Sequence, residues 1–168
     1  MSTAAPLPEP QAHVGNLIRR AQQLHLAMWA QLVSTETTSA QYSILLVLER
    51  RGEASQRELC DDVDLDRSTV ADLVRRMQHG GLIERRRSAE DARRNVVTLT
   101  AAGAAERTRL APRVDDLQRR LTAHMATGDA EGLHRGLRGL LDRPADRSAD
   151  EPPVSSVTPP AGPIARGR

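Results

Sequence analysis

Residues 55–100 read SQRELCDDVDLDRSTVADLVRRMQHGGLIERRRSAEDARRNVVTLT, and this stretch decides the fold. Two short helical patterns flank a tight turn, and the second leads through Gly80-Gly81 into two strand-like runs at 82–87 and 95–100. The segment 88–94 between these runs is too long for a tight hairpin turn, so we expect it to protrude as a wing. The pattern therefore predicts a helix-turn-helix followed by a winged hairpin.

Capping residues mark where these two helices begin and end. Ser55 followed three residues later by Glu58 fits a capping box, and Asp66 can cap the next helix. Gly80 or Gly81 should end that helix, because the position after a helix C-terminus favours positive φ.

Longer helices are predicted on both sides of this stretch. Apolar residues recur at three- and four-residue steps over 14–34 and again from about residue 101 onward. A further helix begins at the Thr38 cap. Pro112 should kink or restart the helix that contains it, and Asp129 can cap a last helix.

The two ends of the chain differ in composition from the part between them. Residues 1–12 contain three prolines and residues 143–168 contain six of the ten. Both segments have few large apolar side chains, so we expect a disordered lead and a disordered proline-rich tail.

Composition excludes several classes of protein. The chain of 168 residues is long enough for one domain, with Trp29 and Tyr42 as its only aromatic side chains. The single Cys60 excludes an internal disulfide and a cysteine-based zinc site; a buried core thiol and a redox switch are both open readings.

Targeting and catalytic signals are also missing from the sequence. No apolar run approaches the ~20 residues that span a bilayer, and the N-terminus does not resemble a secretory signal, so we expect a cytoplasmic protein without a membrane partner. No metal-ligand spacing, P-loop or nucleophile motif occurs, so no catalytic residue, metal or cofactor is predicted.

Positive charge is concentrated in one part of the chain. Between Arg75 and Arg94 there are seven arginines and three acidic residues, a local excess of +4, whereas the whole chain carries only +2. Basic charge gathered on one helix end and one hairpin is typical of surfaces that bind a phosphate backbone.

The ordered motifs resemble those of the MarR family of bacterial transcriptional regulators, over about residues 14–141. The similarity is carried by Asp91-Ala92-Arg93, by Val97-Thr98-Leu99-Thr100 with Gly103, by Leu65–Val70, and by Gly81-Leu82-Ile83. The resemblance implies a mainly α fold with a small β-hairpin, in which a winged helix-turn-helix is flanked by N- and C-terminal dimerisation helices. It also implies a homodimer that binds a pseudo-palindromic operator as a ligand-responsive repressor.

This resemblance implies a domain scheme as well. A winged-helix domain would cover 13–142, with a DNA-binding lobe at 38–100. The dimerisation helices would lie at 13–36 and 101–142.

The second helix of the helix-turn-helix should enter the major groove of double-stranded DNA. Arginine can bind guanine O6 and N7 together, and Ser or Thr can contact bases or phosphates. Asp72 could accept from cytosine or steer an arginine, and both readings are open. The candidates on this helix are Arg67, Ser68, Thr69, Asp72, Arg75 and Arg76.

Phosphate contacts are expected at two further places. Ser55 and Gln56 begin the preceding helix, where backbone N–H groups favour a phosphate. Arg86, Arg87 and Arg94 of the wing region are the other phosphate candidates.

The wing should reach the minor groove, where Arg93 is the candidate for insertion and Asp91 would fix the tip by an ion pair. The alternative is that Asp91 and Arg93 only stabilise the turn.

An aromatic or anionic small effector is the remaining expected partner. His25 and Trp29 share one helix face and Tyr42 opens the next helix, so the three could line a ligand pocket. Alternatively, Trp29 and Tyr42 fill the core and His25 is half-buried beside them.

The sequence is less consistent with two other classes of function. A winged helix can serve as a protein-interaction module without operator binding, but seven arginines within twenty positions are unusual for a protein interface. An enzyme is disfavoured by the missing motifs.

Overall fold

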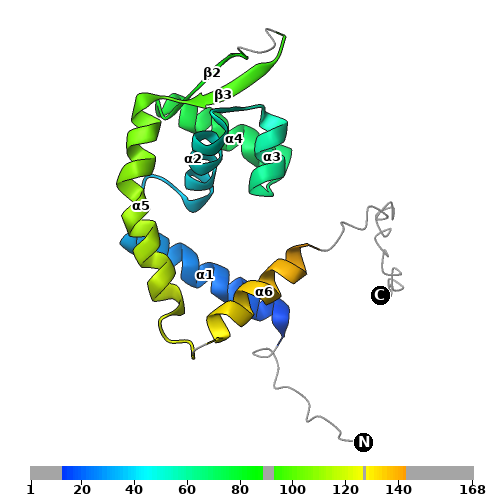
Figure 1. The fold of residues 1–168 in the computed structure, drawn as a ribbon, viewed down its shortest axis with the longest axis vertical. Helices are drawn as coiled ribbons and strands as arrows, with labels where there is room; N and C mark the ends of the chain where they lie inside the picture. The colour runs from blue at the N-terminus through cyan, green and yellow to red at the C-terminus, as the bar shows by residue number, and fades with distance from the viewer. Residues whose placement is uncertain (1–12, 89–92, 127, 143–168) are drawn as a thin grey trace, which may run out of the picture. The chain divides into compact units, whose positions relative to one another are not determined.

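The computed structural model describes residues 13–88, 93–126 and 128–142. The chain forms two compact units that divide between Met125 and Ala126. The described part of the first unit contains, in order, α1 (Val14–Leu32), α2 (Ser39–Arg51), β1 (Glu53–Ala54), α3 (Gln56–Val63), α4 (Arg67–His79), β2 (Ile83–Arg87), β3 (Asn95–Leu99) and α5 (Ala101–Thr122) (Figure 1). The described part of the second unit contains α6 (Asp129–Leu141). The predicted lead and tail, and residues 89–92, lie outside the described residues.

Capping side chains begin α2, α3 and α4 where the sequence predicts. The Thr38 side chain accepts from the backbone N–H of Gln41 at 3.2 Å, and the Gln41 side chain accepts from the backbone N–H of Thr38 at 2.9 Å. Ser55 and Glu58 form the same reciprocal pair at the start of α3. α4 ends at Gly80, and the following Gly81 has φ +73°, as expected for a residue past a helix C-terminus.

The sheet is three-stranded and antiparallel, in the order β1-β3-β2. The hairpin pairs Ile83 with Leu99 and Arg87 with Asn95, which confirms the two predicted strands to within one residue at their ends. The strand β1 was missed, because two residues are too short to show an alternating pattern. Since β1 pairs with β3, the central strand is flanked on both sides. Thr98 is buried, although it is a polar residue that alternates with Val97 and Leu99 along this strand.

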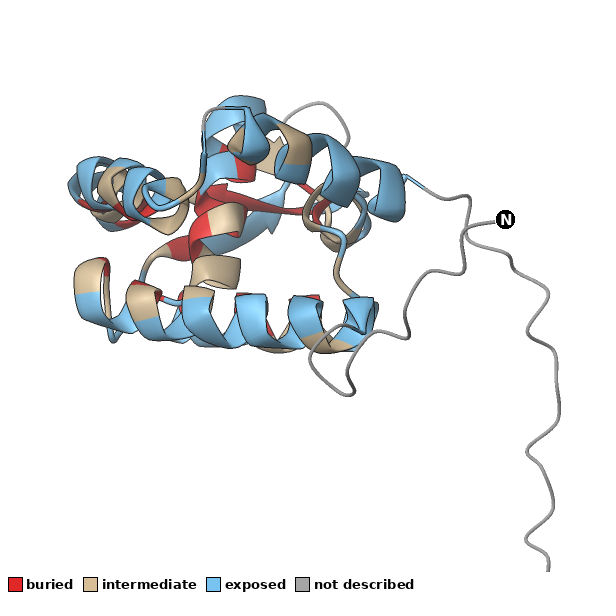
Figure 2. Ribbon diagram, turned by 90° about the horizontal axis from the view of Figure 1, so that it is seen from below, coloured by how far each residue is buried: buried red, intermediate tan, exposed pale blue. Residues whose placement is uncertain are grey.

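Two apolar clusters form the core of the first unit, and Figure 2 shows the buried residues on the inward sides of the elements. The larger cluster lies among α2, α3, α4 and the sheet, and includes Ile44, Leu45, Leu59, Val74 and Met77. The smaller cluster joins α1, the start of α2 and α5, and consists of Trp29, Val33, Tyr42, Leu110 and Leu117.

The start of α5 approaches the sheet so closely that only glycine fits. A Cβ added at Gly103 would lie 1.9 Å from the backbone oxygen of Leu82. The Thr100 side chain caps the helix by accepting from the Gly103 N–H at 3.0 Å, and it donates to the Gly81 carbonyl at 2.6 Å. These contacts are the physical reason for a glycine three residues after this threonine.

Two details of the predicted helices differ in the structure. α5 does not restart at Pro112 but continues through it, with Leu110 and Leu117 on either side buried in the smaller cluster; a kink at Pro112 stays a prediction. Asp129 does not cap α6: Gly128, with φ +91°, occupies that position, and Asp129 is the first helical residue, where its charge complements the helix dipole.

Candidate nucleic-acid interface

The helix α4 presents most of its candidate DNA-binding side chains to solvent. Arg67, Ser68, Arg75 and Arg76 are exposed, and Thr69 and Asp72 are half-buried. The opposite side of the helix packs Val70, Leu73, Val74 and Met77 into the larger core cluster. The apolar face therefore fixes the direction in which the polar face points.

The first turn of α4 is organised by Asp66. Its carboxylate accepts from the Thr69 backbone N–H at 2.9 Å and from the Thr69 hydroxyl at 2.5 Å, and it also accepts from the Ser68 hydroxyl. The Ser68 hydroxyl, followed by the Thr69 groups, lowers the pKa of Asp66 well below its ordinary value. The two hydroxyls predicted to meet DNA are thus held in fixed positions at the helix start.

Asp72 forms ion pairs with two arginines of its own helix. Its two carboxylate oxygens accept from Arg75 and Arg76, three and four residues further along. Of the two roles that the sequence leaves open for Asp72, the structure therefore supports the steering of arginines.

The start of α3 is partly occupied by its own side chain. The Glu58 carboxylate accepts from the Ser55 backbone N–H at 2.7 Å and from the Ser55 hydroxyl at 2.7 Å. These donors and a nearby arginine lower the pKa of Glu58 to about 2, with the Ser55 hydroxyl as the largest cause. The predicted phosphate contact by Ser55 and Gln56 must therefore share this helix end with a carboxylate.

A hollow of about 390 Å³ lies beside the start of α3, and Gln56, Arg57, Cys60 and Arg67 line it. Arg57 is exposed and was not among the predicted contacts, although a basic residue next to Gln56 at a helix start could have indicated it. Cys60 is partly buried and packs against the larger cluster.

The wing brings further arginines to the end of the sheet. Arg85, Arg86, Arg87, Arg93 and Arg94 are exposed. The backbone N–H of Ser88 donates to the Arg94 carbonyl at 2.8 Å, which extends the hairpin beyond its strands. Asp91 lies outside the described residues, so its ion pair and the insertion of Arg93 stay predictions.

Two acidic residues contact the base of the wing, and the sequence analysis missed this role for both. Glu53 of β1 accepts from Arg86 at 3.3 Å and from the Ser88 hydroxyl at 2.5 Å. Glu58 of α3 accepts from Arg94. Glu53 could not be recognised because its strand was not predicted, and Glu58 was assigned only to the helix cap.

The aromatic side chains of the first unit pack against one another in the smaller cluster. The rings of His25 and Trp29 lie 6.0 Å apart in an edge-on arrangement, and those of Trp29 and Tyr42 lie 5.8 Å apart. Trp29 and Tyr42 are each only 6% exposed, and the Trp29 indole donates to the Thr37 carbonyl at 2.7 Å. Both fill the core, while His25 is half-buried; a ligand pocket formed by the three stays a prediction.

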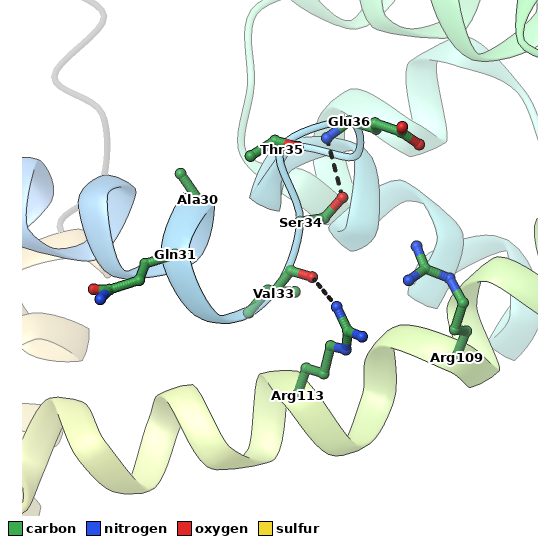
Figure 3. A pocket seen from close by; sticks show the side chains of 8 residues that line it. All are labelled: Ala30, Gln31, Val33, Ser34, Thr35, Glu36, Arg109 and Arg113. Atoms are coloured by element: carbon green, nitrogen blue, oxygen red, sulfur yellow. Dashed lines mark hydrogen bonds between the residues drawn. The ribbon is translucent and has the colours of Figure 1, made fainter.

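A separate cavity of about 290 Å³ lies between the end of α1 and α5. Figure 3 shows the side chains that line it. Arg113 donates to the Val33 carbonyl at 3.2 Å, and Arg109 is paired with Glu106 at 2.8 Å. The charged side chains of the lining are Arg109, Arg113 and Glu36, so the lining carries one more positive than negative charge.

Among the described residues, no helix combines the length and apolar character needed to cross a membrane. In the same part of the chain, no three His, Cys, Asp or Glu side chains gather in a way that could hold a metal ion.

A helix-turn-helix that displays arginines on its second helix, next to a wing that displays more, defines a DNA-binding regulator of the winged-helix class. The model of the MarR family matches residues 36–94. A Thauera aromatica protein named as a transcriptional regulatory protein for the hcr operon is 30% identical over 142 residues, which cover 83% of this chain and 82% of that protein. This chain belongs to the MarR family of transcriptional regulators.

Other relatives agree with this assignment. The transcriptional repressor NicR of Pseudomonas putida is 28% identical over 77% of this chain and 82% of its own length. The PcaV transcriptional regulator of Streptomyces coelicolor, solved with its natural ligand, is 33% identical over 83% of this chain and 99% of its own, with a TM-score of 0.76. These relatives favour DNA binding over the protein-interaction alternative.

Proposed function

We propose that this chain is a ligand-responsive repressor that binds a pseudo-palindromic DNA operator as a homodimer and has no catalytic activity of its own. The observation that carries the proposal is the arrangement of arginines. One winged-helix lobe displays Arg67, Arg75 and Arg76 on α4 and five more exposed arginines on the wing. Repression as the direction of control is supported by the similarity to NicR, which is named a repressor.

In the proposed complex α4 enters the major groove, and its first turns contact base edges. Arg67, Ser68 and Thr69 lie nearest the helix start. Asp72 holds Arg75 and Arg76 together at one place, so both guanidinium groups approach the DNA as a pair. Arg93 is the proposed minor-groove contact, and Arg87 and the start of α3 meet phosphates.

The proposed homodimer is supported by apolar side chains that the single chain leaves exposed. Val14, Leu17 and Leu24 of α1 are 65%, 48% and 53% exposed. Leu133 and Leu137 of α6 are also exposed, at 46% and 41%. Exposed apolar residues of this kind on each helix indicate a face that another chain covers.

The test of operator binding is selection of duplexes from a random library by the full chain, followed by footprinting of the selected sequence. Because a twofold dimer meets successive major grooves on one side of the duplex, we expect a pseudo-palindrome with half-sites roughly 10 bp apart. Failure to enrich any sequence, or enrichment of one asymmetric half-site, would contradict the proposal.

The effector proposal is tested through Trp29, the single tryptophan of the chain. We expect an aromatic acid or phenol that binds near His25 to change the Trp29 fluorescence and to raise the melting temperature, because a ligand that prefers the folded state stabilises it. His25→Ala should abolish the response without unfolding the protein, since His25 is only half-buried. A ligand response that His25→Ala leaves intact would place the effector site elsewhere.

A further inference from the structure

The base of the wing is held from both sides by carboxylates of the helix-turn-helix. On the outgoing strand, Glu53 accepts from the Ser88 hydroxyl at 2.5 Å and from Arg86 at 3.3 Å. On the returning strand, Glu58 accepts from Arg94. We infer that Glu53 and Glu58 are wing-positioning residues, and that Arg86 and Arg94 act mainly as anchors of the wing; the inference rests on the proposed DNA-binding function.

The Glu58 contact shows that its charge serves more than the helix cap. A capping box works with Glu or Gln at this position. The same carboxylate accepts from the backbone N–H and the hydroxyl of Ser55 and from the Arg94 guanidinium, so it joins the start of α3 directly to the wing. A glutamine would keep the cap and lose the ion pair.

The Glu53 contact acts on the opposite strand of the hairpin. Glu53 lies in β1, which pairs with the central strand β3, so its position is fixed by the sheet. Its side chain is only 22% exposed, and the Ser88 that it binds is buried. Because each carboxylate is held by several donors and is mostly shielded, these contacts restrict the hairpin more than an exposed surface pair would.

The placement of two acids at a surface that meets DNA also needs an explanation. A carboxylate near phosphates weakens binding to any sequence, whereas a wing held in one direction places its remaining arginines for one geometry only. The contacts of Glu53 and Glu58 with the wing, here called the clamp, therefore favour discrimination between DNA sequences over general affinity for DNA. It also means that phosphates compete with Glu58 for Arg94.

The first experiment measures hydrogen exchange of the wing amides in the full chain, without DNA. In Glu58→Gln and Glu53→Gln we expect exchange of residues 85–88 and 94–97 to rise roughly two- to fivefold, the range that corresponds to loss of one partly shielded ion pair. Glu84→Gln is the matched control, because it removes the same charge from β2 and Glu84 makes no ion pair among the described residues. Unchanged exchange in both test variants would overturn the inference.

The second experiment compares binding to two duplexes of equal length, the one selected by the wild-type chain and one of random sequence. We expect Glu58→Gln and Arg94→Gln to lower the preference for the selected duplex by a similar factor, and the double variant to lose no more than either alone. If Glu58→Gln tightens binding to both duplexes equally, Glu58 only repels DNA and the inference is wrong. If the wild-type chain itself prefers no duplex, the proposed function fails, whereas the exchange experiment still decides whether the clamp exists.

Discussion

The lobe that extends from α2 to β3 and the helix α1 differ sharply in how they bury apolar side chains. The thirteen residues of α2 include five buried ones, whereas the nineteen residues of α1 include only Trp29. Leu17 and Leu24 remain about half exposed, at 48% and 53%. The lobe thus completes its core within one chain, and α1 leaves an apolar face that we propose a second chain covers.

Because of this difference, the stability of the lobe and the stability of α1 should depend differently on protein concentration. Packing within the lobe is independent of protein concentration, because all of its partners belong to the same chain. The stability of α1 should rise with protein concentration. Association of two chains would stabilise the folded helix by mass action. Operator binding requires a folded lobe and an associated pair of chains, since the two lobes must be held at a fixed separation.

The largest expected effect comes from placing a charge on the exposed apolar face of α1. In Leu17→Glu, a dimer would bury two unpaired carboxylates, so we expect its dissociation constant to rise at least ~100-fold, or about 3 kcal/mol. Sedimentation equilibrium measures the change. Hydrogen exchange of α2, α3 and α4 should remain near the wild-type level, because the lobe keeps its own core.

Gln23→Glu is the control for this substitution. Residue 23 lies six positions from Leu17, which places it about 120° away around the helix at 100° per residue, and the substitution introduces the same acid. If Leu17→Glu and Gln23→Glu both leave the dimer intact, the contrast between the lobe and α1 does not reflect dimerisation.

The next effect concerns the junction between the lobe and α5. In Gly103→Ala the new Cβ would meet the Leu82 carbonyl oxygen at 1.9 Å, and a backbone atom cannot move aside as a flexible side chain can. We expect a loss of about 1–3 kcal/mol in the free energy of unfolding, measured by urea denaturation. Gly136→Ala in α6, where nothing lies within 4 Å, should instead stabilise its helix slightly. Equal stability of the two variants would show that the junction tolerates a side chain.

Local signals explain which parts of this fold could be predicted. The starts of α2, α3 and α4 were correct because each depends on contacts within three residues, such as those of Ser55 with Glu58. The strand β1 and the burial of Thr98 were missed because both depend on pairing with a distant segment. Periodicity contains no information about such partners.

In the candidate site, too, features that depend on nearby residues could be predicted, and contacts between distant residues could not. The exposure of Arg75 and Arg76 could be predicted from the helical period, because the opposite face is apolar. The contacts of Arg86 with Glu53 and of Arg94 with Glu58 span 33 and 36 residues, so no spacing rule reaches them. Likewise, the sequence placed Trp29 and Tyr42 together without deciding whether they line a pocket or fill the core.

A smaller effect is expected from releasing the arginines of α4. In Asp72→Asn the ion pairs to Arg75 and Arg76 are lost, so we expect binding to a random-sequence duplex to tighten about threefold at low salt. The slope of log affinity against log salt should steepen by up to ~0.9 for each arginine that turns to a phosphate. Fluorescence anisotropy over a salt series measures both quantities.

Asp115→Asn is the matched control, since it makes the same charge change on α5, away from the arginines of the lobe. An equal gain in affinity from both variants would mean that only net charge matters, and that Asp72 does not restrain its neighbours.

The smallest effect is a change in the pH dependence of stability, expected for one acid of the lobe and for one acid of α5, the helix that packs against α1. Contacts with Ser55, followed by Arg94, lower the pKa of Glu58 in the lobe to about 2, against an ordinary value of 4.5. In α5, the Arg109 guanidinium, aided by the Thr37 hydroxyl, lowers the pKa of Glu106. Because each folded-state pKa lies below the unfolded one, each acid stabilises the fold above about pH 4.5, and this contribution is lost as the pH falls towards the folded-state pKa.

Replacing either acid by glutamine should therefore flatten the fall in stability between about pH 5 and pH 2. Since the Glu58 side chain is 32% exposed, we expect a difference of only about 0.5–1 kcal/mol for Glu58→Gln, with little change below pH 2. Urea midpoints at a series of pH values, with Glu84→Gln as control, measure it. If the variant keeps the full acid dependence of the wild type, the contacts of Glu58 with Ser55 and Arg94 do not persist in solution, and the lobe is less rigid at the wing than its buried core implies.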